Sequence, residues 1–127
     1  MTYHAAVWID HQEAKIFHLT TQDVEKDAVH NGVPNHHVHR KADHLGLGKT
    51  ALEPAFMTDI ADTLVGARAI LLAGPGQARI ELMRFLEKSH PAIAANVWDN
   101  QPMDHPTDPQ IVAAARTYFN GADRMHG

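Results

Sequence analysis

The chain has 127 residues, of which 44% are hydrophobic and 20% are charged. This size and composition fit a single globular domain over residues 1–127 and leave little room for a second core. There is no cysteine, which excludes disulfides, thiol catalysis and zinc sites built from thiolates. No apolar run approaches the roughly 20 residues of a membrane helix, and the N-terminus lacks the pattern of a signal peptide. We therefore expect a cytoplasmic protein without a membrane partner.

The positive charge of the chain is concentrated in one segment. The whole chain has a formal net charge of −4, so it is not a polycation that coats nucleic acid. Within residues 30–50, Arg40, Lys41 and Lys49 stand against Asp43 alone, which gives +2 there and −6 for the remainder. This segment also holds five of the 11 histidines, which are His30, His36, His37, His39 and His44. Because an imidazole beside an anion readily gains a proton, the segment can become still more positive.

Three strands and a long loop are predicted in the first 50 residues. Apolar residues in 3–10 and 15–20, separated by a polar connection, predict a β-hairpin. Residues 22–30 carry a few apolar side chains among charges, which is typical of an edge strand that continues the meander. The stretch from about 31 to 50 shows neither a helical nor an alternating period and is interrupted by glycine and proline. It predicts a loop of about 20 residues, a length that is usually functional or disordered in compact domains.

Helices and strands alternate in the remainder of the chain. Pro54 and the apolar spacing after it predict a helix that ends near Gly66. A buried strand at 68–73 runs into Gly-Pro-Gly, followed by a helix from about 80 to 90, a short strand at 95–99 and a helix at 109–120. Three antiparallel strands followed by alternating helices and strands predict an α/β domain with a mixed sheet and helices packed on it.

The order of these elements and three stretches of sequence resemble the middle domain of the archaeo-eukaryotic peptide-chain release factors and of the ribosome-rescue factor Pelota. The stretches are AAVWIDHQEAKIF, HHVHRKADHLGLGKTA and ILLAGPGQARIELMRFL. The resemblance covers most of the chain, and it extends to bacterial relatives of uncharacterised role. It implies a ribonuclease-H-like sheet and a part in translation.

In the release factors, the long loop carries a Gly-Gly-Gln tip that enters the peptidyl transferase centre, where the glutamine helps to place the hydrolytic water. The resemblance puts Leu47, Gly48 and Lys49 at these positions. Leucine and lysine supply neither the backbone freedom of glycine nor the amide that orients water. We therefore expect no peptidyl-tRNA hydrolysis by that mechanism, and a role in binding more than in catalysis.

The loop itself has the chemistry of an RNA contact. Arg40, Lys41 and Lys49 can pair with phosphates, and His37, His39 and His44 can stack on bases or donate hydrogen bonds to them. The sequence thus predicts a small translation-associated factor that binds ribosomal or other structured RNA, or transfer RNA. A solvated loop without a partner is one alternative. Another is a metal-binding or protein-interaction module, in which His36, His37, His39 and His44 could form a site for zinc, nickel or copper.

The alternative with a catalytic role is a metal-dependent nuclease. Asp10 ends the first strand, where ribonuclease-H-like nucleases hold a metal-binding carboxylate, and Asp99 and Asp108 are its possible companions. The simpler role for Asp10 is to cap the hairpin turn by accepting backbone N–H groups. Gly74-Pro75-Gly76 either presents N–H groups to a phosphate or makes a tight connection. Nothing in the sequence requires a cofactor, and it does not define an oligomeric state.

Overall fold

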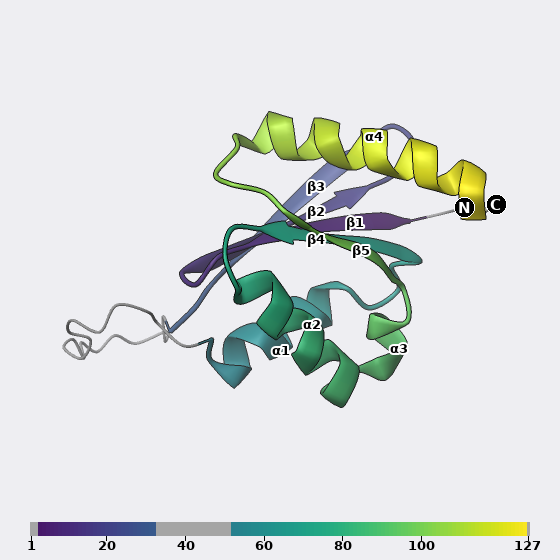
Figure 1. Ribbon diagram of the computed structural model, residues 1–127. Coiled ribbons are helices and arrows are strands. Elements are labelled where there is room, and N and C mark those ends of the chain that lie inside the picture. Colours follow the sequence, from purple (N-terminus) through teal and green to yellow (C-terminus); the bar gives the residue numbers. More distant parts are fainter. Residues whose placement is uncertain (1–2, 33–51, 127) are drawn as a thin grey trace.

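The computed structural model describes residues 3–32 and 52–126, with side chains up to residue 121 (Figure 1). Five strands form one sheet in the order β3-β2-β1-β4-β5. The elements in chain order are β1 (His4–Ile9), β2 (Glu13–Leu19), β3 (Val24–His30), α1 (Pro54–Thr63), β4 (Ala69–Gly74), α2 (Ala78–Ser89), α3 (Pro91–Ala94), β5 (Val97–Pro102) and α4 (Asp108–His126). The predicted α/β class is confirmed.

The sheet is mixed, as the element order predicts. β2 pairs antiparallel with β1 and with β3, whereas β4 lies parallel to both β1 and β5. β4 is buried over its whole length, since it has a strand on each side and helices on both faces. β3 lies at one edge of the sheet, which confirms the prediction of an edge strand that completes the meander.

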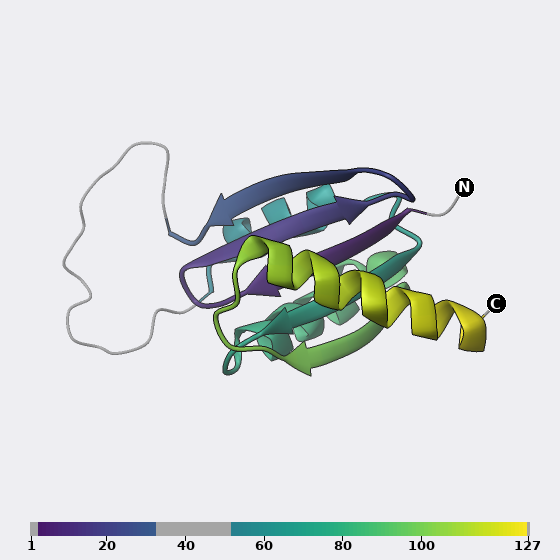
Figure 2. The same ribbon diagram turned by 90° about the horizontal axis from the view of Figure 1, so that it is seen from above.

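Helices cover both faces of the sheet (Figure 1). α1 and α2 pack on one face, and α4 runs across the other, as the view from above shows (Figure 2). Because side chains alternate along a strand, Val7 and Ile9 point into the core under α1 and α2, while Ala6 and Trp8 point into the core under α4. No helix within residues 52–126 is long and apolar enough to cross a membrane.

Several predicted boundaries were wrong. β2 begins at Glu13, before the predicted start at 15, and α4 continues to residue 126, past the predicted end at 120. β5 runs to Pro102, beyond the predicted end at 99, because it pairs with β4 as far as Gly74. Asn100 within it also exchanges hydrogen bonds with Arg79, a contact that no apolar pattern reports. α3 was not predicted, since one turn of helix is too short to show a period.

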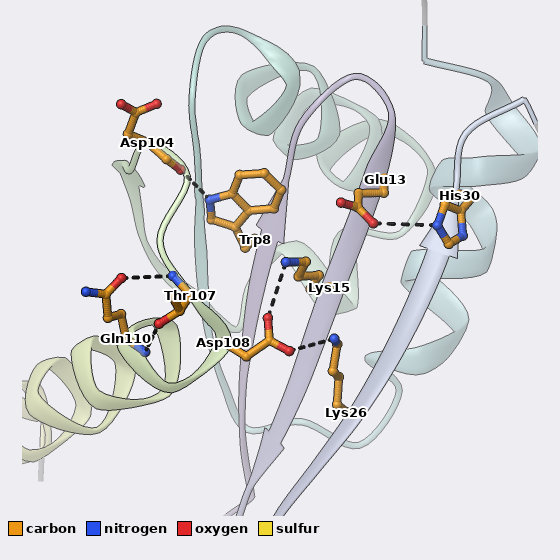
Figure 3. A network of polar contacts seen from close by, with 9 residues as sticks. All are labelled: Trp8, Glu13, Lys15, Lys26, His30, Asp104, Thr107, Asp108 and Gln110. Carbon is orange, nitrogen blue, oxygen red and sulfur yellow. Dashed lines mark hydrogen bonds and ion pairs between the residues drawn. The ribbon is translucent and has the colours of Figure 1, made fainter.

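The start of α4 is anchored by polar contacts (Figure 3). Thr107 Oγ1 accepts the backbone N–H of Gln110 at 3.3 Å, and Gln110 Oε1 accepts the N–H of Thr107 at 2.8 Å. This reciprocal capping satisfies two N–H groups at the helix start. Asp108 accepts from Lys15 Nζ at 3.2 Å and from Lys26 Nζ at 2.6 Å. One carboxylate thereby ties α4 to β2 and to β3.

Candidate nucleic-acid interface

One asparagine joins the two places where segment 33–51 leaves and re-enters the described fold. Asn31 follows β3 and is 8% exposed, and it is the buried polar side chain among those described. Its Nδ2 donates to the carbonyl of His11 at 2.8 Å, and its Oδ1 accepts the backbone N–H of Glu53 at 2.9 Å. Its own N–H donates to the carbonyl of Gln12 at 2.9 Å. A single residue thus connects the β1–β2 turn, the end of β3 and the start of α1.

The residues next to Asn31 and Glu53 have conformations and contacts that suit the end of a strand and the start of a helix. Gly32 has φ of 70°, a left-handed conformation that glycine adopts without steric cost. Leu52 is buried in the core under α1, and Pro54 occupies the first turn of that helix, where its missing N–H is not needed. The described residues on either side of segment 33–51 are therefore fixed by the fold.

The residues predicted to contact RNA all lie in this segment, outside the described residues. The same holds for the positions that correspond to the release-factor tip and for the histidines of the metal alternative. The set comprises His36, His37, His39, Arg40, Lys41, His44, Leu47, Gly48 and Lys49. The structure describes the residues that precede and follow this segment.

The histidines near Asn31 are paired with acidic side chains. Glu13 Oε1 lies 3.5 Å from His30 Nε2 (Figure 3), and Glu81 Oε2 lies 3.3 Å from His11 Nε2. The net charge of −6 outside residues 30–50 agrees with this arrangement. The net charge of the chain outside residues 30–50 is therefore unfavourable for contact with a polyanion.

In the structure, Asp10 caps the turn between β1 and β2, which is the simpler of its two predicted roles. Its Oδ1 accepts the backbone N–H groups of Gln12 at 2.8 Å and of Glu13 at 2.9 Å. These two bonds close the turn between β1 and β2. Its Oδ2 lies 3.6 Å from His105 Nε2. The carboxylate is thus occupied by the turn that it shapes.

The other two carboxylates of the nuclease alternative also have partners of their own. Asp99 Oδ1 accepts the backbone N–H of Asn100 at 2.8 Å. Asp108 bridges Lys15 and Lys26, and its pKa lies below the ordinary value, chiefly because of the hydrogen bond from Lys26. Among the side chains that the structure describes, in residues 3–32 and 52–121, no three His, Asp or Glu side chains are arranged to hold a metal ion.

The Gly-Pro-Gly turn makes a close connection between β4 and α2. Gly74 has φ of 149°, and a Cβ atom at this position would lie 2.0 Å from the carbonyl oxygen of Ile9. Arg79 Nε donates to the carbonyl of Gly74 at 3.2 Å. The first glycine is thus required by the approach of β1, whatever else the turn does.

The sequence did not single out Asn31. The pair Asn31-Gly32 at the end of a predicted strand is a turn signal, and it was the only indication available. The hydrogen bond to Glu53 joins residues 22 positions apart, so it appears only once the sheet and α1 are assembled.

No family model and no curated protein matches the sequence. Among solved structures, the chain is similar to Pelota from Thermoplasma acidophilum, with 24% identity and a TM-score of 0.66 over 96% of this chain and 34% of that one. It is also similar to Pelota from Archaeoglobus fulgidus, with 16% identity and a TM-score of 0.61 over 98% of this chain and 35% of that one. An archaeal translation termination factor matches with 12% identity and a TM-score of 0.52 over 98% of this chain and 42% of that one.

These likenesses concern the fold. The chain spans between 34% and 42% of the proteins that it matches, and the identities are below 25%. The predicted resemblance to the release factors and Pelota is confirmed at this level, and the mixed sheet with helices on it is shared with them.

Proposed function

We propose that this protein is a small translation-associated factor that binds ribosomal or transfer RNA through segment 33–51. The observation that carries the proposal is the likeness of fold, over 96–98% of this chain, to two Pelota proteins and to a translation termination factor. The resemblance in sequence implies the same setting, and it would place the protein in the cytoplasm with the ribosomes.

The chemistry of the contact follows from the distribution of charge. Arg40, Lys41 and Lys49 pair with phosphates, while the imidazoles of His37 and His39 stack on bases or hydrogen-bond to them, together with that of His44. The rest of the chain carries −6, so it does not add to RNA affinity. Asn31, which lies just before this segment, is hydrogen-bonded to His11 and to Glu53.

The proposed activity is binding without hydrolysis of the peptidyl-tRNA ester. Leu47 and Lys49 stand where the resemblance requires a glycine and a glutamine. A leucine restricts the backbone, and a lysine has no amide with which to place a water molecule.

The test is a filter-binding titration with ribosomes and with transfer RNA, at low and at physiological salt. Replacing Arg40, Lys41 and Lys49 together by alanine is expected to weaken binding and to reduce the slope of log K against log salt concentration by about 2 to 3. The matched control replaces Arg68, Arg84 and Lys88, three exposed cations of the described body, by alanine. The proposal fails if the wild type has no affinity, or if both triple variants lose the same amount.

A second experiment with the same protein preparation tests whether it cleaves transfer RNA or only binds it. Labelled transfer RNA incubated with the protein and Mg²⁺ is expected to stay at full length. Shortened products that disappear with EDTA would contradict the proposal and favour the nuclease alternative.

A further inference from the structure

β3 presents an open edge to its surroundings. It pairs with β2 on one side only, and no other element of the described chain lies beyond it (Figure 2). Six of its seven residues are exposed, and Val29 is half-buried. An exposed strand at the edge of a sheet is a template on which another strand can pair.

The backbone groups on this edge point outward. The N–H of Asn31 donates to the carbonyl of Gln12, in register with the β2–β3 ladder. Since bonded and non-bonded pairs alternate along an antiparallel ladder, the odd-numbered residues of β3 bond to β2. Lys26 and Ala28 therefore direct their N–H and C=O groups away from the sheet.

Acidic side chains line this edge on the face that α1 covers. Glu25 lies opposite His18, and Asp27 lies opposite Ile16, which belongs to the core under α1. A pocket of about 310 Å³ is lined by Tyr3, His18, Thr20, Asp23, Glu25 and Asp27. A second pocket, of about 440 Å³, continues between β3 and α1 and is lined by Asp27, Ala28, Val29, His30, Asp59 and Thr63. We name Asp23, Glu25, Asp27 and Asp59 the acidic strip; neither pocket has a lysine or an arginine among its lining residues.

A hydrogen-bonded chain fixes the middle of the acidic strip. The hydroxyl of Tyr3 is bonded to His18 Nδ1, and His18 Nε2 lies 2.9 Å from Asp27 Oδ2. Burial and the negative charges of Asp27 and Glu25 raise the pKa of Tyr3. The pocket is therefore a region of negative potential whose geometry is held by Tyr3, β2 and β3 together.

We propose that the edge of β3 binds an extended peptide segment of a partner protein that has lysine or arginine at every second position. Such a segment adds a strand to the sheet, and its backbone satisfies the outward N–H and C=O groups of Lys26 and Ala28. Its alternate side chains lie beside Glu25 and Asp27, which are two residues apart on the same face. The intervening side chains of the peptide lie on the other face of the sheet, beside Lys26. Because Lys26 is already paired with Asp108, we expect these peptide side chains to be uncharged.

A second copy of this chain fits the edge less well. If the β3 strands of two copies pair antiparallel about a two-fold axis, the side chains of directly opposed residues lie on the same face of the sheet. One residue of β3 must then lie opposite the same residue of the other copy. Registers centred on Glu25, Lys26 or Asp27 therefore bring like charges together, which destabilises the pair. A nucleic acid is repelled by the acidic strip. Charge complementarity thus selects a basic peptide.

The probe is a fluorescently labelled peptide of the length of β3, with lysine and threonine in alternation. Anisotropy titration with the full chain is expected to show saturable binding. A peptide of the same composition with its lysines consecutive is expected to bind more weakly, and one with glutamate in place of lysine is not expected to bind. Equal binding of the alternating and consecutive peptides would overturn the proposal.

Charge variants test the acidic strip. Glu25→Gln combined with Asp27→Asn is expected to weaken binding roughly 5- to 30-fold, as for the loss of two exposed ion pairs. The amide oxygen introduced by Asp27→Asn can still accept the hydrogen bond of His18, so the fold is retained. The matched control is Glu87→Gln with Asp104→Asn, two exposed acids outside the strip that give the same change in net charge. Equal effects of the two double variants would count against the strip.

Backbone pairing is tested on the peptide, so that the folding of the protein is not at risk. Methylation of the peptide amides on the edge that faces β3 is expected to abolish binding, while methylation on the other edge is tolerated. Hydrogen exchange at the amides of Lys26 and Ala28 is expected to slow when the peptide binds. Unchanged exchange there would overturn strand addition, as would self-association of the free protein through β3 in sedimentation experiments.

Discussion

Gly74 marks the point where β4 ends against β1, and it admits no side chain. A Cβ atom would lie 2.0 Å from the carbonyl oxygen of Ile9, at a φ of 149°. Gly74→Ala is expected to lower the free energy of unfolding by roughly 3 kcal/mol or more, through overpacking and backbone strain together. Urea denaturation measures the loss. Gly76→Ala is the control, because Gly76 has φ of 64° with open space around it and should cost about 1 kcal/mol. Equal losses would contradict this account.

Asn31 is a second residue whose effect can be measured alone. Asn31→Ala removes the bonds to His11 and Glu53 and leaves a backbone N–H without its acceptor. The expected loss is about 1–3 kcal/mol in the free energy of unfolding, again from urea denaturation. Gln22→Ala, at an exposed position between β2 and β3, serves as the control and should change it little. If both variants lose the same amount, the bridging role of Asn31 is refuted.

At the scale of elements, one carboxylate and two lysines add to the apolar packing that holds α4 on the sheet. The hydrogen bonds from Lys26 and Lys15 lower the pKa of Asp108 from its ordinary value of 3.8. Asp108 is 36% exposed, so its ion pairs are screened by solvent. Asp108→Asn is expected to cost about 0.5–1 kcal/mol at neutral pH. The comparison variant is Asp62→Asn, which changes an exposed carboxylate on α1.

The effect of Asp108 on stability has a defined dependence on pH. A carboxylate with a lowered pKa in the folded state contributes stability above its ordinary pKa, and this contribution is lost as the pH falls through the folded-state value. The difference in unfolding free energy between wild type and Asp108→Asn should therefore be constant from pH 7 to about 5 and decrease below about 4. Urea denaturation over this range measures it. A difference that grows in acid would show that the ion pairs are not its source.

Elements with a strong local signal were predictable from the sequence, and their ends were not. The apolar run in β4 and the spacing of Ile111 and Ala115 in α4 report burial directly. The sparse apolar residues of β3 likewise indicate an edge. The end of β5 depends on hydrogen bonds with Arg79 of α2, and α3 is a single turn after Pro91. Such features arise from contacts between elements, which a single sequence does not display.

At the scale of the whole molecule, the contacts of Asn31 with His11 and Glu53 could not be predicted from the sequence, for the same reason. The basic residues of segment 33–51 are visible in the sequence, but the amide that joins its ends acts across 22 positions. The acidic strip likewise brings Asp59 of α1 together with Glu25 and Asp27 of β3 and with Asp23, which directly precedes β3. The two proposed contacts therefore have opposite charge preferences, and they adjoin where β3 ends.

The contacts of Asn31 belong to the described fold, whereas the proposed RNA contact lies in segment 33–51. The free energy of closing a flexible connection changes by only about 0.6 kcal/mol when its length doubles. The hydrogen bonds of Asn31 with His11 and Glu53 join the end of β3 to the start of α1 without using any residue of segment 33–51. The scaffold is accordingly suited to the grafting of foreign peptide sequences at this site.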